Sequence, residues 1–328
     1  MGIKDFLSHI KSEASTDIKR IYDHIYMDCN YLIHYLIYNC KNDYDLQTKI
    51  DNFIKNLFDT ISVTTTVNLI FDGNSNTLSI NPKKQTQIAR TKYKKESIDY
   101  DKQPVSPKSK IVLTFKTYLS NIINRYKSLQ KYSFTIHTND DYIDDEADFK
   151  ILYDINDNPY DNICIISRDS DMILIACSLI YNKDIKIDIL SNLRPQLFIN
   201  VKKITEKYKY DYILISLLLG NDYLPKLSNV SYDLVFDSYH KYISHKNPSI
   251  ITDGKLNYTN FINFIMYVIL IKKIKLNVSK IDWKRFNRYY NNILWCLKKY
   301  KVIECDNEYI EDTVNSVVNI YGFIYCGI

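Results

Sequence analysis

Short apolar runs recur along the first two thirds of the chain, and each one stops at polar residues. The five runs lie at residues 25–28, 67–72, 134–137, 163–167 and 185–190. Segments of helical character alternate with them, at residues 31–39, 83–94, 113–129, 172–179 and 211–219. This alternation predicts repeated βα units, and therefore an α/β fold with a mainly parallel central sheet flanked by helices.

The strand pattern fades after Pro225, and helical segments at residues 258–274 and 283–299 dominate the remainder of the chain. We therefore expect an α/β core over residues 1–230 and a helical C-terminal region over residues 231–328 that packs on it. A chain of 328 residues is long enough to bury the hydrophobic core of such an arrangement.

Composition narrows the classes of protein to which the chain can belong. It is 46% hydrophobic and 25% charged, as is ordinary for a soluble protein. The longest apolar run, residues 264–271, is far shorter than the roughly 18 residues of a membrane span. The first residues do not form a signal peptide, so we expect no membrane association and an intracellular location, cytoplasmic or nuclear. Seven cysteines form no CxxC pair, which argues against a zinc finger or a disulfide framework.

Aspartates follow the apolar runs. The residues concerned are Asp28, Asp72, Asp169 with Asp171, and Asp222. Since ligands bind beyond the carboxyl ends of parallel strands, the runs that end at Asp28, Asp72 and Asp169 can deliver their carboxylates to one rim of the sheet. The end of a helix can supply Asp222 to the same rim. Clustered carboxylates repel one another unless cations neutralise them, and all-oxygen sites select Mg²⁺ or Mn²⁺. Taken singly, each aspartate has the alternative role of a helix cap or turn residue.

A second chemical pattern is basic. Lys83, Gln87, Arg90 and Lys94 are spaced at i, i+4, i+7 and i+11, which places them on one face of a helix. Cations and an amide aligned in this way can hold a terminal phosphate. The alternative is an ordinary solvated basic face, because the net charge of +5 does not by itself indicate a nucleic-acid partner.

Six motifs in a fixed order resemble those of the Xrn-type 5′-to-3′ exoribonucleases, within the flap-endonuclease and PIN-like nuclease superfamily. They are MGIKDFL, YMDCNYLIH, IFDG, EADFKI, SRDSDMIL and DYILISLLLGNDYLP, and they cover roughly residues 1 to 260. The resemblance implies a PIN-like core that binds two divalent ions, Mg²⁺ or Mn²⁺. One ion would be held by Asp28, Asp72, Glu146 and Asp148, and the other by Asp169, Asp171 and Asp222.

The same resemblance assigns substrate-binding roles. Lys83, Gln87 and Arg90 match a pocket for a 5′-monophosphate, and Thr91 replaces a family arginine, so Lys94 or Lys92 is expected to substitute for it. His34 matches a histidine that stacks on the first base; its alternative role is that of a core histidine. Asp148 replaces a glutamate and is one methylene shorter. In large Xrn enzymes a second conserved block and accessory domains follow these motifs, whereas this chain stops at Ile328. A protein partner is a candidate source of those regions.

Three functions follow from the sequence. The leading hypothesis is a metal-dependent 5′-to-3′ exonuclease that hydrolyses single-stranded RNA, or DNA, from a 5′-monophosphate end. The first alternative is a flap endonuclease or 5′-to-3′ exodeoxyribonuclease acting on DNA, but residues 225–230 lack the glycine-rich hairpin that follows the corresponding aspartate in flap endonucleases. The second alternative is an inactive relative that binds nucleic acid as a subunit, against which the seven retained carboxylates argue.

Overall fold

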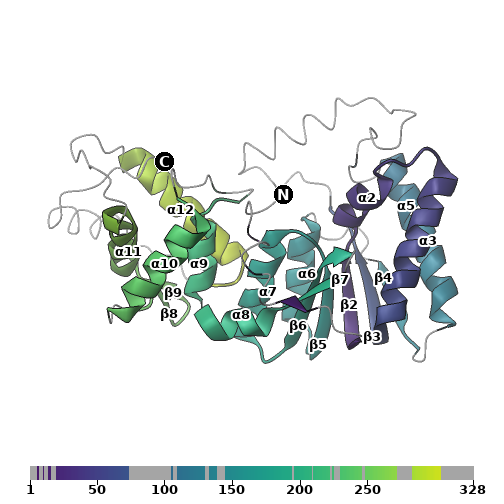
Figure 1. The fold of residues 1–328 in the computed structure, drawn as a ribbon, viewed down its shortest axis with the longest axis horizontal. Coiled ribbons are helices and arrows are strands. Elements are labelled where there is room, and N and C mark those ends of the chain that lie inside the picture. The colour runs from purple at the N-terminus through teal and green to yellow at the C-terminus, as the bar shows by residue number, and fades with distance from the viewer. Residues whose placement is uncertain are drawn as a thin grey trace. The chain divides into compact units, whose positions relative to one another are not determined.

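The computed structural model describes most of the chain, which divides into two compact units (Figure 1). The described residues are 6, 10, 14–15, 20–73, 105, 109–129, 133–138, 145–193, 196–208, 210–221, 224, 230–245, 248–271 and 283–303. The sheet unit runs from Ile10 to Ile204, and the helical unit combines Met1–His9 with Thr205–Ile328. The expected division into a core over residues 1–230 and a helical region over residues 231–328 stays a prediction.

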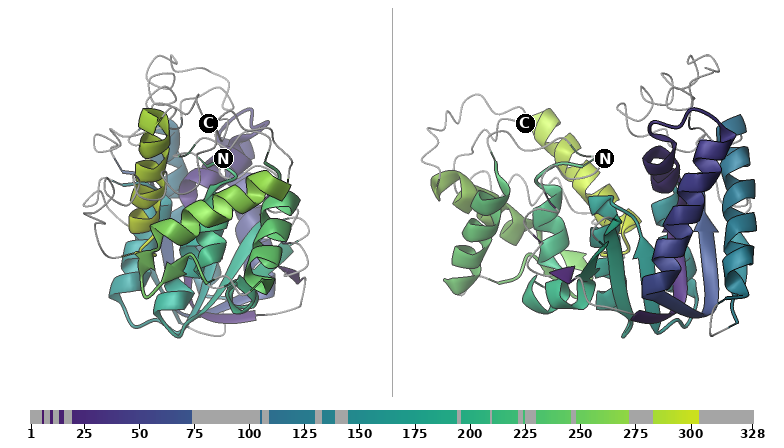
Figure 2. Two further views of the ribbon diagram at one scale, coloured as in Figure 1. Left: turned by 90° about the vertical axis from the view of Figure 1, so that its left-hand side faces the viewer. Right: turned by 45° about the vertical axis from the view of Figure 1, so that its right-hand side comes forward.

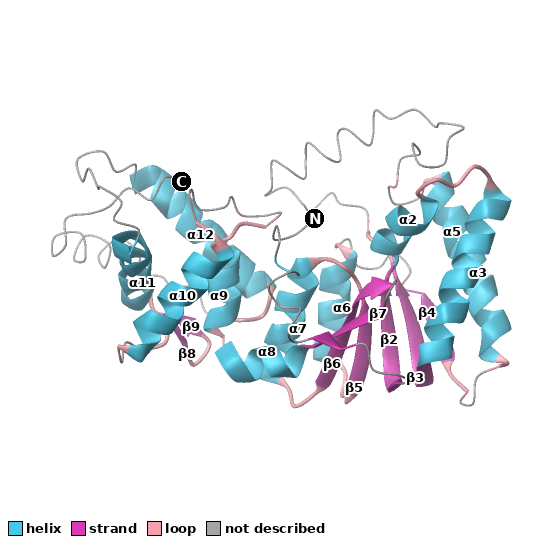
Figure 3. Cartoon of the chain, viewed as in Figure 1, coloured by secondary structure: helices cyan, strands magenta, loops and turns pink. Residues whose placement is uncertain are grey.

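A seven-stranded sheet forms the centre of the sheet unit (Figure 3). Its strands are β1 (Ala14–Ser15), β2 (Arg20–Asp28), β3 (Ile61–Ile70), β4 (Thr135–Thr138), β5 (Asn162–Ile166), β6 (Lys186–Leu193) and β7 (Gln196–Asn200). They lie in the order β1-β7-β6-β5-β2-β3-β4; the pairings from β6 through to β4 are parallel, and β7 is antiparallel to both of its neighbours. The predicted mainly parallel sheet is confirmed, with β2 to β6 at the five apolar runs.

Helices cover both faces of this sheet. They are α2 (Cys29–Ile37), α3 (Asp43–Thr60), α5 (Lys110–Lys127), α6 (Ala147–Asp157) and α7 (Ser170–Asn182), and α8 (Val201–Tyr208) follows β7. Ile25 and Met27 of β2 share one core with α2, α3 and α5, and Figure 2 shows α3 and α5 packed side by side. Since neighbouring strand residues point to opposite faces, Tyr26 points the other way, and its hydroxyl donates to Asp154 of α6.

Helix α3 illustrates how local sequence determines these elements. Leu46, Ile50, Phe53 and Leu57 are buried at spacings of three and four residues, which places them on one face. Asn42 begins the helix, because its side-chain oxygen accepts a hydrogen bond from the amide of Asp45 at 2.9 Å. Of the helices in this unit, α3, α6 and α8 are additional to those that the sequence pattern predicts.

A buried aspartate ties three strands of the sheet unit together. The Asp188 carboxylate on β6 is fully buried, and it accepts hydrogen bonds from Arg20 and Tyr22 of β2, each at 2.7 Å. The side-chain amide of Asn200, on β7, donates to the other carboxylate oxygen at 3.1 Å. Burying a carboxylate is costly unless it is paired and hydrogen-bonded, so this arrangement compensates the charge.

The second unit consists mainly of helices. Its elements are α9 (Asp211–Leu217), α10 (Tyr232–Ser244), β8 (Ile251–Thr252), β9 (Lys255–Leu256), α11 (Tyr258–Ile271) and α12 (Trp283–Lys299). Asp211 is 1% exposed at the start of α9, and it accepts hydrogen bonds from the backbone amides of Ile250 and Ile251 and from the hydroxyl of Tyr239, the last at 2.7 Å. These bonds fasten α10 and the β8–β9 hairpin to α9 within this unit.

Two expectations from composition can be compared with the described residues. The cysteines among them, at positions 29, 40, 164, 177 and 296, are free thiols and all buried. Within the described ranges, no helix is both long and apolar enough to cross a membrane.

Candidate active site

Asp28 lies where β2 ends and α2 begins, and this position determines its contacts. One carboxylate oxygen accepts a hydrogen bond from the Tyr31 amide at 3.1 Å, which makes Asp28 the N-cap of α2. The other oxygen accepts a hydrogen bond from the Ser167 hydroxyl at 3.0 Å. Ser167 follows β5, which pairs with β2 in parallel with Met27 opposite Ile166, so the two strands end at the same edge of the sheet.

Asp72 follows the neighbouring strand, β3, and connects it to α6. Its carboxylate accepts a hydrogen bond from the Ala147 amide at 2.8 Å, at the first residue of α6. The Asp72 amide in turn contacts the side-chain oxygen of Asn30 at 3.4 Å. Because β2 and β3 are parallel, with Asp28 opposite Ile70, Asp72 reaches the same edge as Asp28.

Glu146 and Asp148 lie at the N-terminus of α6, beside Asp72. Glu146 is the N-cap residue and is 9% exposed, and Asp148 lies in the first turn. A helix N-terminus favours negative charge, which stabilises carboxylates at this position. The loop after β3 holds the helix in place: the Gly73 amide donates to the Asp145 carbonyl at 2.8 Å, and the buried Lys150 ammonium donates to the Phe71 carbonyl at 3.0 Å.

Asp169 and Asp171 occupy the corresponding place on α7, which follows β5. Asp169 is the N-cap, and its carboxylate accepts a hydrogen bond from the Asp171 amide at 3.0 Å. Asp171 is 3% exposed in the first turn of the helix. The Asp169 amide donates to the Ser167 hydroxyl at 3.2 Å, so Ser167 joins Asp169 to Asp28.

Burial and neighbouring charges both act on the Asp28 carboxyl group. Burial is the largest cause of a rise in its pKa from the ordinary value of 3.8 to about 7, and the negative charges of Asp72 and Asp169 raise it further. Hydrogen bonds from Tyr31 and Ser167 oppose the rise. The charges of Asp72 and Asp169, which follow β3 and β5, therefore act on Asp28 at the end of β2.

The structure brings together six of the seven predicted carboxylates at one edge of the sheet. They are Asp28, Asp72, Glu146, Asp148, Asp169 and Asp171. Asp222 lies outside the described residues, as do Lys83, Gln87, Arg90 and Lys94. His34 is exposed on α2, so its alternative role as a core histidine is wrong, and its stacking role stays a prediction.

The ligands that this edge of the sheet offers are carboxylate oxygens, which repel one another when charged. Sites made of oxygen ligands suit hard divalent cations, so the chemistry of these residues fits such an ion. Within the described ranges, no three His, Cys, Asp or Glu side chains are grouped closely enough to hold one ion. The assignment of ligands to two ions therefore stays a prediction.

The motif analysis did not assign roles to Ser167, Asn30 and Lys150. Ser167 precedes the aspartate pair by two residues, and Lys150 follows Glu146 by one helical turn. Polar residues within a turn of a carboxylate motif are therefore the signal that could have identified them. Their contacts to Asp28, Asp72 and Phe71 suggest that they position the carboxylate edge.

Fold and site together define an α/β protein with a cluster of carboxylates at the carboxyl ends of its parallel strands. In sequence, the chain is similar to 5′-3′ exoribonuclease 1 of Saccharomyces cerevisiae, with 20% identity over an alignment of 375 residues. The alignment covers 89% of this chain and 24% of the yeast protein, so the chain spans about a quarter of the length of that relative. This similarity confirms the resemblance indicated by the motifs. No protein-family model matches the sequence.

Two solved structures show partial similarity. The catalytic core of Rad2 in complex with DNA substrate has a TM-score of 0.48 and 13% identity, covering 96% of this chain and 85% of that chain. A flap endonuclease of bacteriophage T5, in a complex with DNA and metal ions, has a TM-score of 0.37 and 14% identity, covering 85% of this chain and 100% of that chain. TM-scores this low indicate only partial correspondence, and nothing about substrate follows from them.

Proposed function

We propose that the protein is a divalent-metal-dependent nuclease that degrades single-stranded RNA from a 5′-monophosphate end. The observation that carries this proposal is the position of Asp28, Asp72 and Asp169 at the carboxyl ends of neighbouring parallel strands, since carboxylates at one edge favour a divalent cation that neutralises them. The choice of RNA and of the 5′ end rests on the motifs and on the similarity to the yeast exoribonuclease.

The residues of the carboxylate edge have distinct roles in this proposal. Asp28, Asp72, Glu146 and Asp148 would hold one cation, and Asp169, Asp171 and Asp222 the other. Divalent cations bound in this way supply Lewis-acid stabilisation of a phosphodiester and lower the pKa of water. Ser167 orients Asp28 through its 3.0 Å hydrogen bond. Lys83, Gln87, Arg90 and Lys94 would hold the terminal phosphate, and His34 would stack on the first base.

A substrate comparison tests the proposal directly. Matched single strands of RNA and DNA, with 5′-phosphate or 5′-hydroxyl ends, are incubated with the protein and Mg²⁺ or Mn²⁺. We expect the 5′-phosphorylated RNA to be degraded fastest. Equal rates on 5′-hydroxyl ends would contradict the phosphate pocket, and faster cleavage of flapped duplex DNA would favour the flap-endonuclease alternative. Tight binding of strands without any cleavage would instead favour an inactive binding subunit.

Matched variants test the role of the carboxylate edge. Asp169→Asn retains an oxygen that can cap α7 but removes the charge, so we expect at least a roughly 100-fold loss of cleavage with little loss of stability. Asp184→Asn is the control, because Asp184 is exposed and lies two residues beyond the other end of the same helix. Equal activity of the two variants would contradict the role of Asp169.

A further inference from the structure

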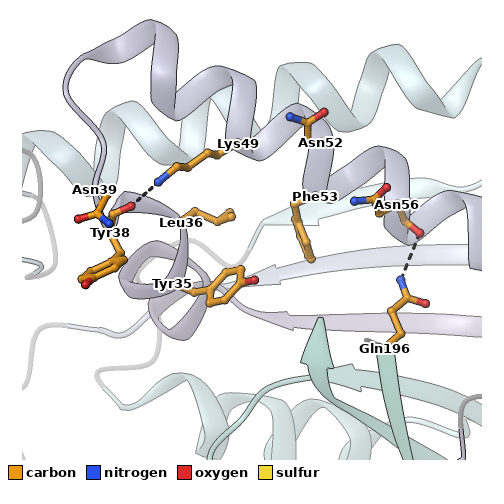
Figure 4. Close-up of a pocket in the computed structure, with 9 residues that line it drawn as sticks. All are labelled: Tyr35, Leu36, Tyr38, Asn39, Lys49, Asn52, Phe53, Asn56 and Gln196. Atoms are coloured by element: carbon orange, nitrogen blue, oxygen red, sulfur yellow. Dashed lines mark hydrogen bonds between the residues drawn. The ribbon is translucent and has the colours of Figure 1, made fainter. Parts of the chain in front are cut away.

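A cavity of about 350 Å³ lies between α2 and α3 in the sheet unit (Figure 4). Its lining residues are Tyr35, Leu36, Tyr38, Asn39, Lys49, Asn52, Phe53, Asn56 and Gln196. This volume is within the range of small-molecule binding sites, roughly 300 to 1,000 Å³. None of the residues assigned to the carboxylate edge contributes to it.

The cavity is lined by apolar side chains and by neutral side-chain amides. Leu36 and Phe53, which are 4% and 6% exposed, supply the apolar part. Asn39 and Asn52 are exposed, and within the described part of the chain their amide groups make no hydrogen bond. Lys49 is the cation among the lining residues, and its ammonium donates to the Tyr38 carbonyl.

These lining groups select a class of ligand. The side-chain amides of Asn39 and Asn52 each offer a donor and an acceptor, which matches the hydrogen-bonding edge of a nucleobase, whereas the Gln196 amide already donates to the Asn56 carbonyl at 3.2 Å. The lining contains no carboxylate, so the cavity does not suit a metal ion. A planar base with polar edges fits this combination of amides, aromatic rings and one cation.

A stripe of tyrosines connects the cavity to the carboxylate edge. Tyr31, Tyr35 and Tyr38 are spaced at i, i+4 and i+7, so they lie along one face of α2 and its C-cap. The rings of Tyr31 and Tyr35 have centroids 6.1 Å apart. Aromatic residues at helical spacing usually pack in a core, but Tyr35 is 39% exposed and Tyr38 is 66% exposed. Exposed rings in a row provide stacking surfaces for successive bases.

Helix α2 also determines how far the cavity lies from the carboxylates. Asp28 caps its N-terminus, and Tyr38 is its C-cap. Ten residues at about 1.5 Å each separate the two positions by about 15 Å along the helix axis. The cavity is therefore too distant to hold the nucleotide at the carboxylates, but a base further along the same strand could reach it.

We propose that Tyr35, Tyr38 and the amide-lined cavity bind a base of a single-stranded nucleic acid, downstream of the nucleotide held at the carboxylate edge. This inference rests on the proposed function and deepens it, since it assigns a second contact to the same strand. Stacking on an aromatic ring is sequence-tolerant, whereas the amides favour some bases over others.

Strand binding by the full-length chain in EDTA, which prevents cleavage, tests this site. The probe is a fluorescent 5′-phosphorylated RNA of about 12 nucleotides, and its Kd is measured by anisotropy. For the double variant Tyr35→Ala/Tyr38→Ala we expect Kd to rise roughly 5- to 100-fold, because each stacked base is lost. The control is Tyr44→Ala, since Tyr44 is 75% exposed on α3 but does not line the cavity; its Kd should match that of the wild type.

A second variant and a location measurement complete the test. Asn52→Asp places a negative charge in the cavity at an exposed position, so it should weaken strand binding several-fold without unfolding the protein. Photo-crosslinking of an RNA that contains 5-iodouracil should label the peptide of residues 21–41, which carries all three tyrosines.

Each outcome has a definite meaning. If the wild type binds the strand and both variants bind it equally well, or if crosslinks fall only outside residues 21–56, the cavity proposal is wrong and the proposed function is unaffected. If the wild type binds no strand at all, the cavity proposal is wrong, and the cleavage comparison with Mg²⁺ or Mn²⁺ decides the proposed function separately.

Discussion

Replacing Asp28 with asparagine should stabilise the metal-free protein while removing a carboxylate from the site. The carboxyl group is 9% exposed, and its pKa is raised from 3.8 to about 7. Since one pKa unit corresponds to about 1.4 kcal/mol, the charged form costs up to about 4 kcal/mol of folding free energy. Asparagine keeps an oxygen that can accept from the Tyr31 amide, so the cap of α2 is retained.

The sign of the pH dependence follows from the direction of the shift. The folded state holds the Asp28 proton more tightly than the unfolded state, so the free energy of unfolding falls as pH rises from about 4 to about 7 and is level above that. The asparagine side chain of the variant carries no proton to lose. The difference between Asp28→Asn and wild type should therefore be near zero at about pH 4 and reach its maximum at about pH 8.

Urea unfolding in EDTA across this pH range measures the effect, with Asp184→Asn as the control for removing an exposed carboxylate. Adding Mg²⁺ should stabilise the wild type and have a smaller effect on the variant, since the variant lacks one of the proposed ligands. A variant that is less stable than the wild type at about pH 8 would refute the reasoning. A stability difference that does not change with pH would refute it equally.

Three further substitutions probe contacts elsewhere in the structure, and urea unfolding measures each one. Ser167→Ala removes a donor to Asp28, so we expect a loss of about 1–2 kcal/mol and lower nuclease activity; unchanged values would contradict a positioning role. Arg20→Met leaves the buried Asp188 without its cation and should cost about 3–5 kcal/mol, and a loss below about 1 kcal/mol would contradict the pairing. Asp211→Ala leaves two backbone amides and a tyrosine hydroxyl without their acceptor, with an expected loss of about 2–4 kcal/mol, whereas Asp211→Asn should lose less.

Strands β2, β3 and β5 could be predicted from sequence because each ends in an apolar, buried run. The runs that contain Ile25, Val67 and Ile163 all form parallel strands, and the carboxylates after them reach one edge because parallel strands end together. Helix α6 was not predicted, because its first turn lies in an acidic cluster that is interpreted as a set of metal ligands. Its helical nature becomes evident only from Phe149, Ile151, Leu152 and Ile155, which pack beneath that turn.

Contacts between residues far apart in the sequence could not be predicted in the same way. Ser167 meets Asp28 across 139 residues of sequence, and Asp211 meets the Ile250 amide across 39 residues. No local pattern encodes such pairs, because they depend on how strands and helices are placed relative to one another. Ser167 and Asn30 also belong to residue types that are common in turns, so their type alone does not indicate a role in the site.

The neighbours of Asp188 and Asp211 differ in kind from those of Asp28. Asp188 is surrounded by an arginine, a tyrosine hydroxyl and an amide, and Asp211 by two backbone amides and a tyrosine hydroxyl. Donors of this kind compensate a buried negative charge within the fold. Asp28 has two donors, but its other neighbours include Asp72 and Asp169, whose charges oppose its ionisation. A folded chain retains such a group at a cost in stability, and a cation bound by the same carboxylates would recover that cost.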